Sequence, residues 1–153
     1  MAVTKEMRGV GFCLALAMGL LLAGCHEQPR ATPSLAGTSW QLAELRALDS
    51  AGTTVRPNDP ASYELEFGAD GSLAMRLDCN RGMARWNATP TPEGYGDITI
   101  SAGAMTRAMC PPGSLDNRIA QEIGLVRRYS IEDGRLMLIL NADHGMQVWS
   151  PKP

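Results

Sequence analysis

The chain has 153 residues, of which 44% are hydrophobic and 20% are charged, and this fits one globular domain but is too short for two. Sixteen acidic side chains against fourteen basic ones give a formal net charge of −2, whereas proteins that bind nucleic acid usually carry a basic excess. The composition therefore argues against a disordered chain and against a nucleic-acid partner. It does not point to a chemical reaction.

The first 24 residues are typical of a secretion signal. Basic side chains precede an uncharged apolar stretch at 9–24, which is shorter than the roughly 20 apolar residues of a membrane-spanning helix. The stretch ends in Leu-Ala-Gly-Cys at 22–25, which resembles the bacterial lipobox, whose cysteine carries diacylglycerol. We expect a mature chain that begins at Cys25 with three acyl chains, enough for stable membrane attachment. The alternative is an ordinary signal peptide in which Cys25 is incidental.

Residues 25–36 are predicted to be the lipidated cysteine and a flexible linker, because the polar stretch contains two prolines. The mature chain has no polybasic patch, so the lipid would supply the membrane affinity. His26 stands where an aspartate would favour inner-membrane retention in enteric lipoproteins, so that resemblance favours the outer membrane, facing the periplasm. We expect a monomer that contacts the membrane through its lipid and also contacts an envelope protein or ligand that the sequence does not identify.

Two of the four cysteines, Cys79 and Cys110, lie in the body of the chain. An even pair in a secreted domain is most simply explained by one disulfide, because the compartment is oxidising. A reactive thiol and a metal site are the alternatives. Zinc-type spacing is absent, since neither cysteine is in a CxxC pair and the mature chain offers only His26 and His144. We expect no metal and no cofactor.

The folded part, predicted at 37–150, begins with strands. The apolar positions at 39–48 alternate and then slip, which predicts a strand over the first half of that stretch. Strict alternation at 63–67 and 73–77 about a short turn predicts a hairpin. One face of the hairpin is apolar and the other is charged, which indicates an antiparallel sheet with one buried face. The apolar face comprises Tyr63, Leu65, Phe67, Leu73, Met75 and Leu77, and the charged face comprises Glu64, Glu66 and Arg76.

Later elements alternate between strands and turns, apart from one helix. Helical spacing predicts a helix at 114–128, with Ser114 as its cap and Arg127 and Arg128 in its last turn. Seven or eight short strands with one helix predict a mainly β, α+β fold, either a curled antiparallel sheet or a partly open barrel whose end or edge the helix covers. The remaining predictions are strands at 83–87, 98–100 and 146–149, a loop at 89–94, and a hairpin of 129–131 with 135–140.

Four short motifs, in this order and spacing, resemble the META domain, a family that includes the HslJ-like heat-inducible envelope lipoproteins. They are Gly-Thr-Ser-Trp at 37–40, Cys-Asn-Arg at 79–81, Met-Thr-Arg-Ala-Met-Cys at 105–110 and Asp-Gly-Arg-Leu at 133–136. The resemblance covers about residues 35–150. It implies a compact β-rich fold with one helix, and the family has no established catalytic reaction.

Three polar residues are candidates for binding. Asn80, beside Cys79, can contact a ligand, although asparagine also tolerates positive φ and often stabilises a turn. Thr106 and Arg107 can form a polar pocket near the cysteines, in which the guanidinium binds a carboxylate or phosphate. The structural alternative is an arginine that bonds loop carbonyls. The methionines of the body are expected to fill gaps in a small core, and Trp40 is expected in that core.

No catalytic residues are predicted, because His144 is the only histidine of the domain and no Ser-His-Asp set can be assembled around it. The first hypothesis is therefore a non-enzymatic, membrane-tethered envelope lipoprotein with a binding or stress-protective domain. The second is an inhibitor of a lysozyme or protease that attacks the envelope, which inserts a loop such as 90–95 into a cleft. The third, ranked last, is a thiol enzyme that uses Cys79 or Cys110.

Overall fold

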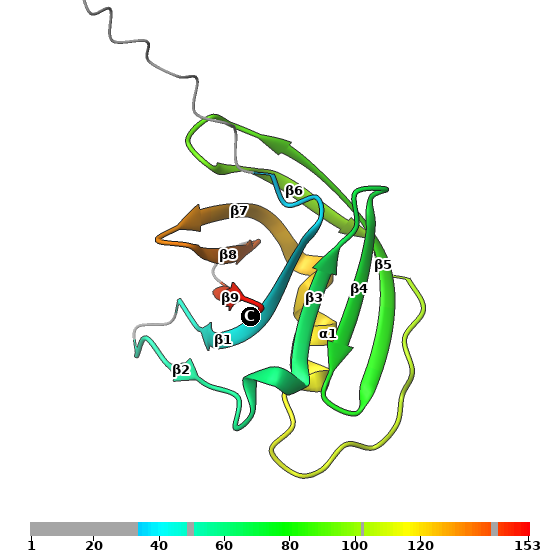
Figure 1. Cartoon of the computed structure of the whole chain (residues 1–153). Helices are drawn as coiled ribbons and strands as arrows, with labels where there is room; N and C mark the ends of the chain where they lie inside the picture. Colours follow the sequence, from blue (N-terminus) through cyan, green and yellow to red (C-terminus); the bar gives the residue numbers. More distant parts are fainter. Residues whose placement is uncertain (1–33, 49–50, 102, 142–143) are drawn as a thin grey trace, which may run out of the picture.

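Antiparallel strands curl into a barrel that closes on itself, as the computed structural model in Figure 1 shows. The structure describes residues 34–48, 51–101, 103–141 and 144–153, so the predicted signal at 1–24 and Cys25 lie outside the described residues. The strands are β1 Thr38–Arg46, β2 Thr54–Val55, β3 Tyr63–Phe67, β4 Ser72–Leu77, β5 Asn80–Pro90, β6 Tyr95–Ser101, β7 Val126–Glu132, β8 Arg135–Leu140 and β9 Met146–Pro151. The α-helix is α1 Asp116–Glu122, and two 3-10 turns are η1 Pro60–Ser62 and η2 Ile123–Leu125.

The predicted mainly β fold with one helix is confirmed, and the barrel is closed. Eight strands follow one another around it in the order β1, β3 to β9, and β9 pairs with β1 to complete the ring. The short strand β2 pairs with Leu45 and Arg46, at the C-terminal end of β1. Closure removes the two free edges that an open sheet would expose.

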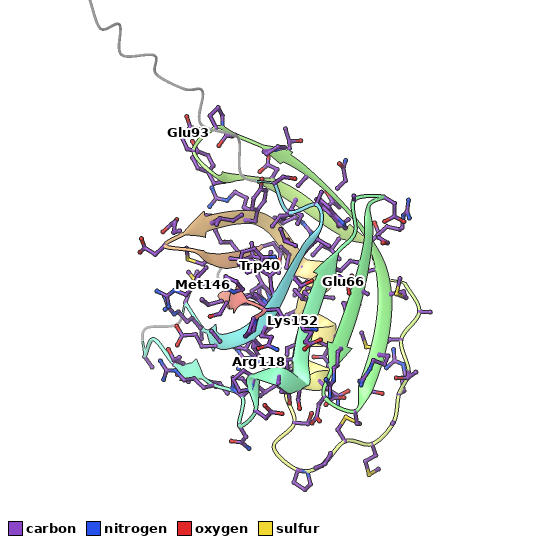
Figure 2. The ribbon with its side chains drawn as sticks, in the orientation of Figure 1. Trp40, Glu66, Glu93, Arg118, Met146 and Lys152 are labelled. Atoms are coloured by element: carbon purple, nitrogen blue, oxygen red, sulfur yellow. A yellow bond between two sulfur atoms is a disulfide. The ribbon has the colours of Figure 1, made fainter. Side chains whose placement is uncertain are left out.

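The β3–β4 hairpin follows the alternation in its sequence. Its six predicted core side chains are all buried, and the register pairs Leu65 with Met75 and Phe67 with Leu73. On the outer face Glu64 is opposite Arg76, but its ion pair at 3.0 Å is with Lys152, beyond the end of β9. Lys152 is labelled in Figure 2.

Strand β1 is longer than predicted because it contains a β-bulge. Its register against β9 shifts between Leu42 and Glu44, and this extra residue brings Leu45 back to the interior. Leu42 and Leu45 are both fully buried although they are three positions apart. The slip in the alternation therefore marks a bulge within one strand, not its end.

Strand β5 is also longer than the predicted strand at 83–87. Its first half pairs with β4 and its second half with β6, so a single bent strand belongs to two parts of the wall. Thr89 and Pro90, predicted as loop, pair with Asp97 and Gly96. A proline is tolerated there because it ends the strand.

The predicted helix at 114–128 is too long. Helix α1 ends at Glu122, a single 3-10 turn follows, and Val126 already begins β7. Arg127 and Arg128 therefore lie on a strand and not in a last helical turn. Val126 is buried at the start of β7, and its spacing from Ile119 and Ile123 also matches the buried face of a helix, so the apolar spacing could not separate helix from strand.

The helix is fixed to the barrel at both ends. The residue before it is Leu115, not Ser114, and its backbone N–H donates to the Tyr63 hydroxyl at 3.0 Å. The Ser114 hydroxyl instead accepts the Asp116 N–H at 3.3 Å. At the other end Glu122 accepts a hydrogen bond at 3.1 Å from the buried Gln147 of β9. Figure 1 shows α1 behind β3 and β4 in this view.

The core continues into the predicted linker. Leu35 is buried, and its carbonyl accepts the Thr38 N–H at 3.1 Å, so the ordered domain begins before residue 37. Trp40 is buried as predicted, and Trp149 lies fully inside. Trp86 is half-buried and packs edge-on against Phe67, with ring centroids 5.3 Å apart. In the part of the chain that the structure describes, no helix is long and apolar enough to cross a membrane.

Candidate functional site

The candidate residues gather where the β4–β5 turn meets a long segment before the helix. A disulfide joins Cys79, in that turn, to Cys110, with the Cα atoms 5.5 Å apart, so the predicted bond is present. We call residues 103–110 the strap. The turn is tight, since Leu77 pairs directly with Asn80, and Asp78 adopts the left-handed conformation at φ 55°. The turn residue with positive φ is thus Asp78 and not Asn80.

Asn80 is buried and fully occupied with internal hydrogen bonds. Its amide nitrogen donates to the Ala108 carbonyl at 3.1 Å and to the Asp116 carboxylate at 2.9 Å. Its amide oxygen accepts the Ala108 N–H at 2.8 Å and the Thr106 hydroxyl at 2.9 Å. One side chain therefore ties β5 to the strap and to α1. Asn80 and Thr106 are positioning residues here, because their polar atoms are bonded to the protein itself.

Backbone hydrogen bonds hold the strap along the outer edge of β5. The Met83 N–H donates to the Ala104 carbonyl at 2.8 Å, and the Thr106 N–H donates to the Arg81 carbonyl at 2.9 Å. The approach is so close that a Cβ added at Gly103 would lie 2.0 Å from the Met83 carbonyl oxygen. Only glycine fits at that point. Figure 1 shows this segment running alongside β5 before it turns back to α1.

A pocket of about 300 Å³ lies between the strap and α1, and we call it the mouth pocket. The structure brings the three candidate residues Asn80, Thr106 and Arg107 together in its wall. Helix α1 contributes Asp116, Asn117 and Ala120 to the opposite wall.

The guanidinium of Arg107 is exposed and has no hydrogen bond or ion pair among the described residues. The alternative role considered for it, bonding loop carbonyls, belongs to Arg81, whose Nη1 donates to the carbonyls of Asp78 and Asn80, both at 2.9 Å. Arg81 and Asp116 are the residues of this site that sequence reasoning missed. Arg81 stands inside the Cys-Asn-Arg motif, which was the available signal.

The four methionines around the strap divide into two groups. Met75 and Met105 fill the space over Gly82, where an added Cβ would lie 3.0 and 2.8 Å from their methyl carbons. This is the predicted gap-filling role. Met83 is 52% exposed and Met109 is 99% exposed, so for these two the core prediction is wrong. Both exposed methionines lie at the strap, and Met83 lines a shallow outer depression of about 450 Å³.

Charge around the strap is mainly positive, although the whole chain is mildly acidic. Arg81 lines the outer depression, Arg85 lines a second one beside Gly103, and Arg107 lines the mouth pocket. Asp116 is the acidic group of the mouth pocket, and its carboxylate accepts from Asn80. Within the described residues no group of three histidine, cysteine, aspartate or glutamate side chains could hold a metal ion.

A cluster of ion pairs lies elsewhere, around Glu44 of β1. Burial raises the pKa of the Glu44 carboxyl, but hydrogen bonds and positive charge from Arg46 and Arg56 outweigh burial, so its pKa lies below the ordinary value. The distance from the Arg56 Nη2 to the Glu44 Oε2 is 2.7 Å. On β7 burial raises the pKa of Tyr129. These groups stabilise the barrel and are separate from the mouth pocket.

Comparison with known proteins identifies the family and the fold. The structure is similar to the NMR structure of a protein from Burkholderia xenovorans, with a TM-score of 0.61 and 15% identity over 98% of this chain and 99% of that one. It is also similar to a crystal structure of a DUF4847 family protein from Bacteroides vulgatus, with a TM-score of 0.52 and 11% identity over 76% of this chain and 93% of that one. No curated protein matches the chain. The sequence model of the META domain matches residues 33–152, and the chain therefore belongs to the META domain family.

Proposed function

We propose that the protein is a non-catalytic envelope lipoprotein, tethered to the outer membrane through Cys25, whose META domain binds another envelope component at the mouth pocket. The observation that carries the proposal is Arg107. It is an exposed guanidinium at the wall of a pocket of about 300 Å³, without a partner among the described residues, whereas Asn80 and Thr106 are bonded internally. An unengaged guanidinium fits a bidentate contact to a carboxylate.

The chemistry of the site supports binding over catalysis. The two Sγ atoms of Cys79 and Cys110 are bonded to each other, so thiol chemistry would first require reduction of that bond. His144 lies in the β8–β9 connection, and its Nδ1 is 2.9 Å from the Asn141 carbonyl. The Leu-Ala-Gly-Cys sequence supports the tether, and the nine peptide units that separate Cys25 from Ser34 can span at most about 30 Å.

In-cell photocrosslinking tests the proposal. A photoreactive residue replaces Met109, which is 99% exposed beside the mouth pocket, and in a matched control it replaces Leu48, which is 52% exposed after β1. We expect a discrete adduct from position 109 and none from position 48, and loss of this adduct in the Arg107→Glu background. Equal adducts from both positions, or an adduct indifferent to Arg107→Glu, contradict the proposal. A Cys25→Ser variant should leave the membrane fraction.

A second candidate function is inhibition of a hydrolase that attacks the envelope, and the β5–β6 hairpin favours it. Figure 1 shows this hairpin reaching beyond the rest of the barrel, and Figure 2 labels Glu93 at its tip. The tip is tied by hydrogen bonds from the Thr91 N–H to the Tyr95 carbonyl at 2.8 Å and from the Ile131 N–H to the Gly94 carbonyl at 2.8 Å. Tyr95 is 53% exposed.

Inhibition assays with secreted lysozymes and proteases separate the two functions. The inhibitor hypothesis requires dose-dependent inhibition that is lost in a Glu93→Ala, Tyr95→Ala variant and retained in Arg107→Glu. Inhibition that is lost in Arg107→Glu and retained in the Glu93→Ala, Tyr95→Ala variant assigns the contact to the mouth pocket. Absence of inhibition by the full chain ends the inhibitor hypothesis.

A further inference from the structure

The strap is bonded on one side only. Along β5 its backbone groups alternate, and those of Ala104 and Thr106 point to Met83 and Arg81. In an extended chain the groups of the intervening residues point the other way. These are the N–H and C=O groups of Met105 and Arg107, and among the described residues none of the four has a hydrogen-bond partner.

This free edge is open to solvent. Met105 is half-buried, and the other strap residues from Gly103 to Met109 are exposed. Figure 1 shows the segment on the outer side of β5, with no other described strand beyond it in this view. An exposed strand edge is a template for pairing with another chain, and natural proteins usually cover or interrupt such edges. In the barrel wall β9 pairs with β1, whereas the outer edge of the strap has no strand partner among the described residues.

From this edge we propose that the protein binds its partner by strand addition, in which an extended acidic segment of another protein pairs with Met105 and Arg107. The inference deepens the proposed function and rests on it. Backbone hydrogen bonds would supply affinity, and alternate side chains of the added segment would reach the mouth pocket. The apolar surface of Ala120 and Met109 fits small aliphatic side chains, and Arg107 fits a carboxylate.

Charge decides between a different protein and a second copy of this chain. Two straps paired edge to edge would bring the positive groups Arg81, Arg85 and Arg107 of one copy toward those of the other, which is destabilising. An acidic segment meets the same groups with opposite charge. The favoured occupant is therefore an acidic segment of a partner protein.

Residue-resolved hydrogen exchange on the full chain in detergent micelles tests the mode of binding. The probe is a capped heptapeptide in which valine alternates with glutamate, and the matched control peptide has lysine in place of glutamate. We expect the amides of Met105 and Arg107 to become at least about tenfold slower in exchange with the glutamate peptide and to be unaffected by the lysine peptide. Gly134, at the tip of the remote β7–β8 hairpin, should not respond.

Two variants separate the charge from the backbone. Arg107→Ala removes the guanidinium and its methylene stem but keeps the backbone N–H, and it should weaken binding of the glutamate peptide by about tenfold. Arg107→Pro also removes the N–H and should abolish the protection of Met105. Thr106 exchange in each free variant reports whether the strap still pairs with β5.

The possible outcomes are distinct. Amides of Met105 and Arg107 that are already protected in the free chain, protection by both peptides alike, or no protection by millimolar glutamate peptide would each overturn strand addition. If the edge fails in this way while the in-cell adduct at position 109 still depends on Arg107, the binding function stands and only its mode is wrong. If the adduct also fails, both are wrong.

Discussion

The first half of β5 has β4 on one edge and the strap on the other, and the two neighbours are held by different forces. Strand β4 pairs at six successive positions and buries Leu73, Met75 and Leu77. The strap makes a few backbone hydrogen bonds, and none of its residues is fully buried. It is held mainly by the side chain of Asn80 and by one disulfide. The β4 side is thus stabilised by continuous strand pairing and apolar burial, and the strap by a small number of specific contacts.

The largest expected effect lies on the β4 side. Leu73→Ala removes a fully buried side chain, so the free energy of unfolding should fall by about 3 to 5 kcal/mol through lost burial and the cavity left behind. Urea unfolding measures it. The matched control is Glu66→Ala, an exposed position on the adjacent strand, which should change stability by less than about 0.5 kcal/mol. Similar effects of the two changes would mean that β4 is not anchored by its buried face.

The disulfide comes next. Replacing both Cys79 and Cys110 by serine opens a cross-link with a sequence separation of 31, and the unfolding free energy should fall by about 3 kcal/mol, since the unfolded chain is no longer constrained. Thermal unfolding with and without reductant measures it. In the serine variant reductant should have no further effect. A wild-type chain that is indifferent to reductant would show that the cross-link does not stabilise this domain.

A single amide should matter almost as much for the strap. Asn80→Ala leaves the Asp116 carboxylate and the Ala108 N–H without their partners, which should cost about 1 to 3 kcal/mol. The control is Asn87→Ala, an exposed asparagine on the same strand, which should be near neutral. If Asn80→Ala is as mild as Asn87→Ala, the network around Asn80 is not what holds the strap.

The smallest effect is a pH dependence that belongs to the barrel and not to the strap. The ordinary pKa of a glutamate carboxyl is 4.5. The hydrogen bond from Lys152 lowers the pKa of Glu64 below this value, and Arg46 and Arg56 lower the pKa of Glu44 despite its burial. Each carboxyl therefore binds fewer protons in the folded chain than in the unfolded chain. Its contribution to the free energy of unfolding is complete above pH 4.5 and is lost as the pH falls through the lowered pKa of the folded chain.

Unfolding measured at pH 7 and at pH 3 to 4 should show this loss, and Arg56→Ala should reduce it by less than about 1 kcal/mol because the Arg56 side chain is 71% exposed. Stability that rises on acidification would contradict the pKa direction of Glu44 and Glu64.

The same contrast explains what could be predicted from the sequence. The β3–β4 hairpin repeats one rule, alternation with one buried face, and its core residues followed from that rule. The disulfide followed from the number of cysteines and from the expectation of an oxidising compartment. Prediction failed where two elements share a pattern: the buried Val126 fits the spacing of a helix but lies on a strand, and the bulge in β1 imitates the end of a strand.

The sequence predicted which residues lie at the site, but not what each of them does there. The motif residues Asn80, Thr106 and Arg107 do share one pocket. Their division into two internally bonded side chains and one free guanidinium depends on contacts across 26 to 36 positions of sequence, to Thr106 and Asp116, which local spacing does not encode. Arg81 was missed for a different reason: its carbonyl partners Asp78 and Asn80 are close in sequence, but only the folded turn directs them at its guanidinium.

The strap is fixed to β5 on one edge and free on the other, and hydrogen exchange on the oxidised and the reduced full chain measures this difference. We predict that in the oxidised chain the Thr106 amide is protected while those of Met105 and Arg107 exchange freely, and that reduction releases Thr106 before Met75 of β4. Protection of Met105 and Arg107 in the oxidised chain, or an unchanged Thr106 after reduction, would contradict the account.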